Sequence, residues 1–224
     1  MTPSYPVGLI WLRRDLRLHD NAAIYQAAKH CAKLYCVFVF DDSILCALPH
    51  ADRRVEFICQ SLSELDADLR QHTSRPETSL ITRRGLPQDI IPALAQQLGA
   101  SAVFCNDDDE PTALARDAQV ARSLKADGRL LLRYKDHRIF ARDEVLTQSL
   151  SPFSVFTPYT NAWLKKVTPF YLSSYPSERD LAGKLADFPE GDRRPIPTAT
   201  DLGFAPDTLQ GLRLPTGVSG ARQL

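Results

Sequence analysis

Charged side chains of both signs follow four apolar segments of this 224-residue chain, and they define its available chemistry. Carboxylates accept hydrogen bonds from ring N–H and hydroxyl groups, whereas arginines stack on flat rings or donate to carbonyl oxygens. This mixture suits the binding of a planar, polar heterocycle. The clusters are Arg13–Asp20, Asp41–Asp42, Arg83–Gly85 and Asn106–Pro111, with Arg53 and Arg54 at the start of an expected helix.

No residue set in the sequence forms a recognisable catalytic device. The chain has no G-x-G-x-x-G fingerprint, no P-loop and no G-x-S-x-G nucleophile elbow. Its five histidines lack recognisable partners, and its five cysteines form no C-x-x-C pair. A divalent metal held by the carboxylates is a lesser alternative. We therefore assign no catalytic and no metal-binding residue, and we expect binding rather than bond-making.

The elements that would position these clusters alternate regularly along the first 134 residues. We expect strands at 7–12, 34–40, 78–82, 101–106 and 129–134, and helices at 21–31, 53–70, 89–98 and 111–126. Five strands alternating with four helices predict an α/β fold, a five-stranded parallel Rossmann-like sheet with helices on both faces. Ligands of such sheets bind beyond the carboxyl ends of the strands, so the clusters should meet at one edge.

Three regions are expected along the chain. Residues 1–140 form the α/β domain, residues 141–172 an aromatic segment packing on it, and residues 173–224 an extended, proline-punctuated linker. Asp20 is expected to cap the first helix, and Trp11 is expected in the core.

Composition narrows the class of protein further. The formal net charge is zero, which argues against this chain binding nucleic acid by itself. The start lacks a signal peptide, the apolar runs are too short for a membrane span, and the cysteines read as buried free thiols. We expect a cytoplasmic monomer.

Four motifs resemble the DNA photolyase/cryptochrome family. They are "WLRRDLRLHDN" (Trp11–Asn21), "RRVEFICQSLSELDADL" (Arg53–Leu69), "EPTALARD" (Glu110–Asp117) and "VFTPYTNAWLK" (Val155–Lys165). The resemblance covers roughly residues 7 to 170 in the family's order and spacing. It implies the N-terminal α/β domain of a photolyase, which holds a light-harvesting antenna chromophore, a folate or a deazaflavin.

The resemblance also implies what this chain would need beyond itself. In the family, a helical domain follows, holds flavin adenine dinucleotide (FAD) and binds DNA containing a pyrimidine dimer. Residues 173–224 are expected to lead to such a domain, which is missing from this sequence. By this interpretation the chain is truncated, and damaged DNA binds only through that domain. The chain alone would then be inactive in repair.

The resemblance nominates five cofactor-binding residues: Arg14, Asp41, Arg54, Asp108 and Glu110. The Asp-x-Glu-Pro pattern ending at Pro111 is typical of deazaflavin-type members. Folate-type members carry an Asn-Glu pair where this chain has Thr112 and Ala113. An 8-hydroxy-deazaflavin is therefore preferred, with methenyltetrahydrofolate second and an empty site third. Alternative functions are a cryptochrome-type photosensory module, or a nucleotide-binding α/β domain of the universal-stress or electron-transfer-flavoprotein type.

Overall fold

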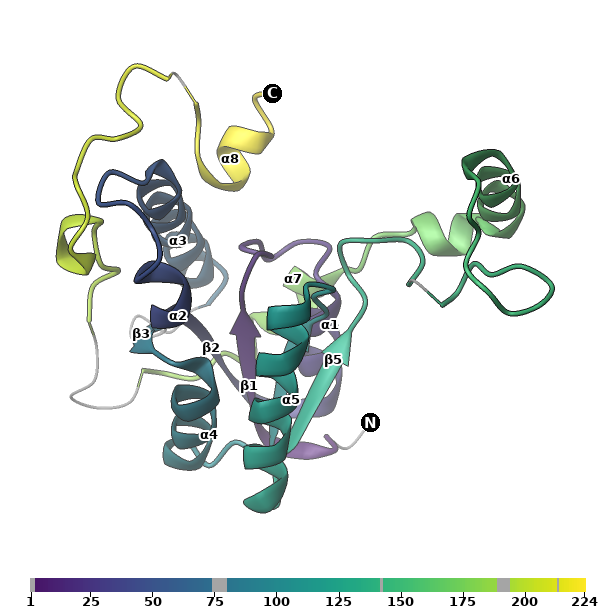
Figure 1. The fold of residues 1–224 in the computed structure, drawn as a ribbon. Helices are drawn as coiled ribbons and strands as arrows, with labels where there is room; N and C mark the ends of the chain where they lie inside the picture. The colour runs from purple at the N-terminus through teal and green to yellow at the C-terminus, as the bar shows by residue number, and fades with distance from the viewer. Residues whose placement is uncertain (1–2, 74–79, 142, 189–193, 213) are drawn as a thin grey trace.

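A parallel five-stranded sheet forms the centre of the molecule (Figure 1). The computed structural model describes residues 3–73, 80–141, 143–188, 194–212 and 214–224. The strands are β1 (Tyr5–Leu12), β2 (Cys31–Asp41), β3 (Ile81–Gly85), β4 (Ala102–Asn106) and β5 (Leu130–Tyr134). They lie in the order β3-β2-β1-β4-β5, and every neighbouring pair is parallel. The fold class expected from the sequence is confirmed.

Helices cover both faces of this sheet. They are α1 (Ala22–His30) and α3 (Arg53–Gln71) on one face, and α4 (Pro87–Gln97) and α5 (Pro111–Ala126) on the other. The central strand β1 is apolar without alternation because both of its faces are covered. Its residues Ile10 and Leu12 pack toward α1 and α3, whereas Leu9 and Trp11 pack toward α4 and α5. Trp11 is a core residue, as expected.

Side chains of the neighbouring strand β2 explain a glycine in β1. A Cβ atom built on Gly8 would lie 2.5 Å from Cys31 Sγ and 3.0 Å from Leu34 Cδ2. No side chain fits there without displacing the core.

Two boundaries on the β3 side differ from the expectation. Strand β3 pairs with β2 from Ile81 to Gly85, so the Arg83–Gly85 cluster lies within the strand rather than after it. The expected start of this strand falls partly outside the described residues. Helix α4 begins at Pro87, because proline at the first helical position gives up no hydrogen bond. Pro92 therefore lies inside the helix rather than in its first turn.

The cap of α1 is Asn21, so the prediction for Asp20 is wrong. Asn21 accepts a hydrogen bond from the Ile24 N–H at 3.1 Å. Asp20 adopts a left-handed backbone, with φ of 46°, and its carboxylate accepts from the Tyr175 N–H at 2.8 Å instead. A residue in that conformation ends the preceding turn and cannot act as the extended N-cap.

The segment after residue 173 is attached to the sheet domain over much of its length. Helix α7 (Ser177–Leu181) lies against α1, and Leu185 forms an isolated parallel bridge to Leu34 of β2. Leu181, Leu185 and Leu202 are buried in the core beside α1 and α3. Thr208 and Leu209 contact Glu56 of α3, and Ser219, in helix α8 (Gly217–Ala221), contacts Glu64 of the same helix α3. The expected role of this segment as a linker between domains stays a prediction.

Residues 156–172 project from the sheet domain (Figure 1). Helix α6 (Phe156–Lys166) has no buried residue. Its Trp163 packs edge-on against Phe140, with ring centroids 5.6 Å apart, so it holds the segment that leaves the sheet. Phe156 and Phe170 are 78% and 80% exposed. Among the described residues, no helix has the length and apolarity needed to cross a membrane.

Candidate functional site

A buried polar network fixes the loop that follows β1. The Asp15 carboxylate accepts from the Arg13 N–H at 2.8 Å and from the side-chain amides of Asn21 and Asn106 at 3.1 and 2.6 Å. Asn106, the last residue of β4, accepts in turn from the Ala23 N–H at 2.9 Å. The ends of β1 and β4 and the start of α1 are therefore locked together. Such a network is rigid because each buried polar group has a partner.

A second network holds two arginines against the indole ring of Trp11. The side chain of Asp117 is fully buried and receives two hydrogen bonds from Arg13 Nη1, at 2.7 and 2.9 Å. Arg116 lies 3.3 Å from Asp117 and 3.7 Å from Asp41. The guanidinium carbons of Arg13 and Arg116 lie 4.9 and 5.2 Å from the centre of the Trp11 ring. Both cations are thus oriented by carboxylates and by a π face.

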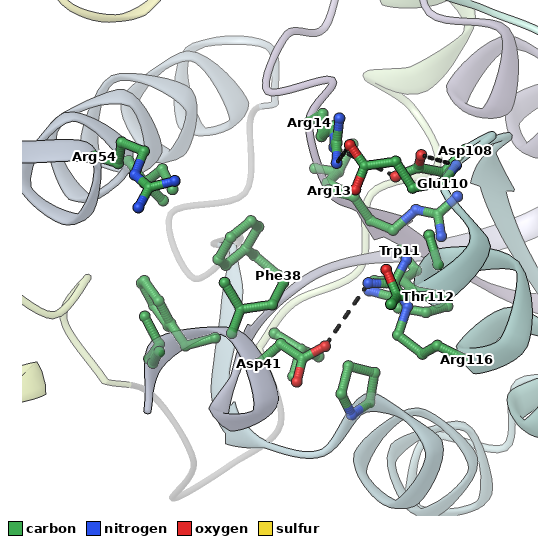
Figure 2. Close-up of a pocket in the computed structure, with 18 of the residues that line it drawn as sticks. Trp11, Arg13, Arg14, Phe38, Asp41, Arg54, Asp108, Glu110, Thr112 and Arg116 are labelled. Carbon is green, nitrogen blue, oxygen red and sulfur yellow. Dashed lines mark hydrogen bonds and ion pairs between the residues drawn. The ribbon is translucent and has the colours of Figure 1, made fainter. Parts of the chain in front are cut away.

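These networks border a cavity at the carboxyl edge of the sheet, which we call the rim cavity (Figure 2). Its volume is about 340 Å³. It lies beside the switch point of the sheet, because β1 continues into α1 on one face and β4 into α5 on the other. Its apolar lining includes Phe38, Ile44, Leu48, Ile58 and Pro87.

Arg14 and two carboxylates form one side of the mouth. Arg14 Nε lies 3.3 Å from Asp108 Oδ2, and Nη2 lies 2.7 Å from Glu110 Oε1. The hydrogen bond to Glu110 raises the pKa of Arg14. Burial alone would raise the pKa of Asp108, but the Glu110 N–H and the charge of Arg14 outweigh it and lower that pKa. Asp108 is therefore an anionic acceptor at neutral pH.

Asp41 and Arg54 come from the opposite side of the rim cavity (Figure 2). Asp41 caps the short helix α2 (Asp42–Leu45) by accepting from the Ser43 N–H at 2.9 Å, and its other oxygen faces Arg116. Arg54 belongs to the first turn of α3, where the N-cap Asp52 holds its guanidinium at 2.6 Å. Most of the Arg54 side chain remains exposed.

All five residues predicted to bind a cofactor line this one cavity, although their role in binding stays a prediction. The Arg83–Gly85 cluster is not among the lining residues. Arg84 instead pairs with Asp42 at 2.7 Å and donates to the Leu202 carbonyl at 3.0 Å. Arg53 donates to the Thr208 carbonyl at 3.0 Å. Two of the expected groups thus hold the chain together at the surface.

Sequence reasoning missed Arg116, which contributes a cation to the inner wall of the rim cavity. A signal was present in α5. Asp117 falls on the apolar stripe that includes Ala113, Val120 and Leu124, and all four residues are buried. A carboxylate at such a position needs a buried cation. That cation is Arg13, and the same carboxylate orients Arg116.

The rim cavity has the polarity of a site for a flat, polar ring system. Its apolar walls can cover the ring faces, while Asp41 and Asp108 accept hydrogen bonds and Arg116 donates them. The volume falls within the usual range of small-molecule sites. Among the described residues, no group of three potential metal ligands is found.

Comparison with known proteins agrees with this geometry. The family model described as DNA photolyase matches residues 8–179. The chain is 36% identical over 197 residues to a deoxyribodipyrimidine photo-lyase from Synechococcus sp. (strain ATCC 27144 / PCC 6301 / SAUG 1402/1). That match covers 88% of this chain but 40% of the relative, so the chain spans less than half of that photo-lyase.

A shorter relative and a solved structure extend the comparison. An uncharacterized 31.6 kDa protein from Synechococcus sp. (strain PCC 6716) is 35% identical over 222 residues, covering 98% of this chain and 74% of the relative. A class III photolyase from Agrobacterium tumefaciens superposes with a TM-score of 0.75 at 21% identity, covering 100% of this chain and 44% of that one. The family model spans more than half of the sequence, and the chain belongs to the DNA photolyase/cryptochrome family, whose N-terminal α/β domain it carries.

Proposed function

We propose that this chain is the light-harvesting domain of a photolyase and that the rim cavity binds the antenna chromophore. The carrying observation is that Arg14, Asp41, Arg54, Asp108 and Glu110, which come from four separate parts of the sequence, all line one cavity. Independent helix caps and surface ion pairs have no reason to meet there. In a longer protein the domain would pass excitation energy to a flavin held elsewhere, for light-driven repair of pyrimidine dimers.

An 8-hydroxy-deazaflavin fits the chemistry of the lining better than methenyltetrahydrofolate. Its tricyclic ring offers flat faces to Phe38 and Ile58 and carbonyl oxygens to Arg116, and its hydroxyl group can donate to a carboxylate. Thr112 and Ala113 also line the cavity, where folate-type members carry the Asn-Glu pair. These short side chains leave room for a wider ring. When bound, the chromophore would supply near-ultraviolet and blue absorption.

Titration of the purified chain with each chromophore tests this proposal. We expect 8-hydroxy-deazaflavin to bind with a shift or quenching of its fluorescence, and methenyltetrahydrofolate to bind less tightly. Adenosine triphosphate should not compete. Tight binding of adenosine triphosphate, with neither chromophore bound, would instead support a nucleotide-binding domain and overturn the proposal.

Neutral variants of the mouth carboxylates make the test specific. Asp108→Asn and Glu110→Gln should each weaken deazaflavin binding by roughly 1–3 kcal/mol, because each removes a charged hydrogen-bonding group. Asp127→Asn, at the far end of α5, is the matched control and should bind as the wild type does. Unchanged affinity in both mouth variants would mean that these carboxylates serve only the start of α5.

A further inference from the structure

A second cavity adjoins the rim cavity and has a different charge. We call it the basic cavity; its volume is about 610 Å³. It shares Arg13, Arg14 and Ile58 with the rim cavity, so the two are neighbours. Its remaining lining comes from the loop after β1, from α3 and from the last residues of the chain: Leu16, Arg17, His19, Phe57, Ser61, Gly217, Val218, Ala221 and Arg222.

The lining of the basic cavity holds four arginines and a histidine, and no described aspartate or glutamate lines it. Arg13, Arg14 and Arg17 are also ion-paired, but the carboxylates that pair with them do not line the basic cavity. Arg14 and Arg17 use Nε or Nη2 for these pairs, toward Glu110 and Asp136 among others. Among the described residues, the Nη1 groups of Arg14 and Arg17 donate no hydrogen bond, so they can donate to a ligand.

Of the four arginines that line the basic cavity, Arg222 is the one without a carboxylate partner among the described residues. It is exposed, and within the described part of the chain it forms no ion pair. Its neighbours Val218 and Ala221 add apolar contact opposite Phe57 and Ile58. A cavity with basic ends and apolar walls is suited to a flexible chain that carries an anionic group.

Hydrogen bonds from α8 to a carboxylate of α3 hold α8 in place. A free carboxylate near the cavity would repel an anionic ligand. The Glu64 carboxylate accepts from the Ser219 N–H at 2.6 Å and from the Ser219 hydroxyl at 2.7 Å. Glu56, two helical turns earlier on α3, accepts in the same way from the Leu209 N–H at 3.0 Å. The carboxylates of Glu56 and Glu64 are therefore bonded to the segment that contains Leu209 and Ser219, and neither lines the basic cavity.

Gly217 makes this attachment possible. Its φ is +70°, and a Cβ atom built on it would lie 2.1 Å from Glu64 Oε2. The positive φ favours glycine at the start of α8, and the Glu64 carboxylate occupies the space that a Cβ atom would fill.

We propose that the basic cavity is a subsite for the anionic tail of the ligand whose ring occupies the rim cavity. The tail would be a phosphate ester or a glutamyl carboxylate, held by Arg14, Arg17 and Arg222. This inference rests on the proposed function, and it adds that the preferred chromophore is a tailed, negatively charged form. Arg14 stands between the two cavities and can contact both the ring and the tail.

Two matched pairs of probes test the subsite on the full chain. The first pair is 5-deazariboflavin and its 5′-phosphate, which share a ring system and differ in one anionic group. The second is methenyltetrahydrofolate as monoglutamate and as triglutamate. We expect the added anion to raise affinity about tenfold in at least one pair, and the gain to shrink as salt is added. The pair that shows the gain identifies the anion.

Variants then assign that gain to the basic cavity. Arg222→Gln should remove most of the gain and leave the affinity for 5-deazariboflavin unchanged. Val218→Asp, which places a carboxylate in the cavity, should remove it fully. Arg122→Gln, an exposed arginine on α5, is the control for the loss of one charge and should keep the gain.

The two proposals fail in different ways. If 5-deazariboflavin binds and neither anion adds affinity, the subsite is wrong and the chromophore site stands. An anion gain that survives in both Arg222→Gln and Val218→Asp also overturns the subsite. If no probe of either pair binds, the proposed function is wrong and the subsite falls with it.

Discussion

Asp117 is the residue on which the inner wall of the site depends. Its buried carboxylate receives Arg13 and orients Arg116, and both arginines lie over the Trp11 ring. A buried ion pair adds little to stability in itself, but the loss of one partner leaves an uncompensated charge. The pair therefore matters for the shape of the site more than for the strength of the fold.

Asp117→Asn should lower the free energy of unfolding by about 3–5 kcal/mol, the cost of leaving a buried guanidinium without its carboxylate. Chemical denaturation followed by circular dichroism measures this change. Asp127→Asn, at the C-cap of the same helix, removes an exposed partner of Arg129 and should cost no more than ~1 kcal/mol. Equal, small effects of the two variants would mean that Arg13 finds enough compensation in the Asn106 carbonyl.

At the scale of elements, the start of α1 shows why a cap is difficult to predict from local sequence. Asp20 and Asn21 are adjacent and have nearly equal preference for the N-cap. Tertiary contacts decide between them, because Asn21 also donates to Asp15 and accepts from Asn106. Those partners lie 6 and 85 positions away in the sequence.

Asn21→Ala should reduce the free energy of unfolding by about 2 kcal/mol, the upper part of the range for a lost N-cap, because Asp15 and Asn106 also lose a partner. Asp20→Gly should change it by less than about 1 kcal/mol, because glycine tolerates the left-handed backbone that Asp20 adopts. Thermal denaturation of both variants gives the comparison. A larger loss of unfolding free energy in Asp20→Gly than in Asn21→Ala would mean that Asp20 is the N-cap of α1.

The strand and helix order followed from the sequence because each element has a continuous or periodic apolar pattern. The expected span of α5 matches the structure, since proline marks its first position and its apolar face is regular. The end of β3 was misplaced because Arg83 and Arg84 look like loop residues, yet they pair with β2 along the sheet edge. Local polarity cannot reveal a pairing between residues more than 40 positions apart.

At the scale of the whole molecule, the region after residue 173 was the least predictable. It buries single side chains, such as Leu181 and Leu185, between polar and proline-rich stretches. No periodic pattern marks residues that reach the core one at a time. The candidate site was more accessible to sequence reasoning, because strand ends in a parallel sheet must share an edge. Arg116 and the basic cavity depend on tertiary packing that the motifs do not encode.

Leu185→Ala tests whether this region belongs to the core. We expect a loss of about 2–5 kcal/mol in the free energy of unfolding, because the side chain is buried beside Leu34. Leu172→Ala is the control, since Leu172 is 64% exposed and should be nearly neutral. Urea denaturation measures both. No destabilisation in Leu185→Ala would show that residues after 173 are only loosely attached, as a linker would be.

The position of Trp11 has a practical consequence for anyone studying this protein. The chain contains two tryptophans, and only Trp11 lines the rim cavity. In a Trp163→Phe background, the tryptophan emission of the protein would come from Trp11 alone. A ligand that absorbs blue or near-ultraviolet light and binds next to Trp11 would quench this emission by resonance energy transfer. The fluorescence of Trp11 would therefore report how much of the rim cavity is occupied, without an added label.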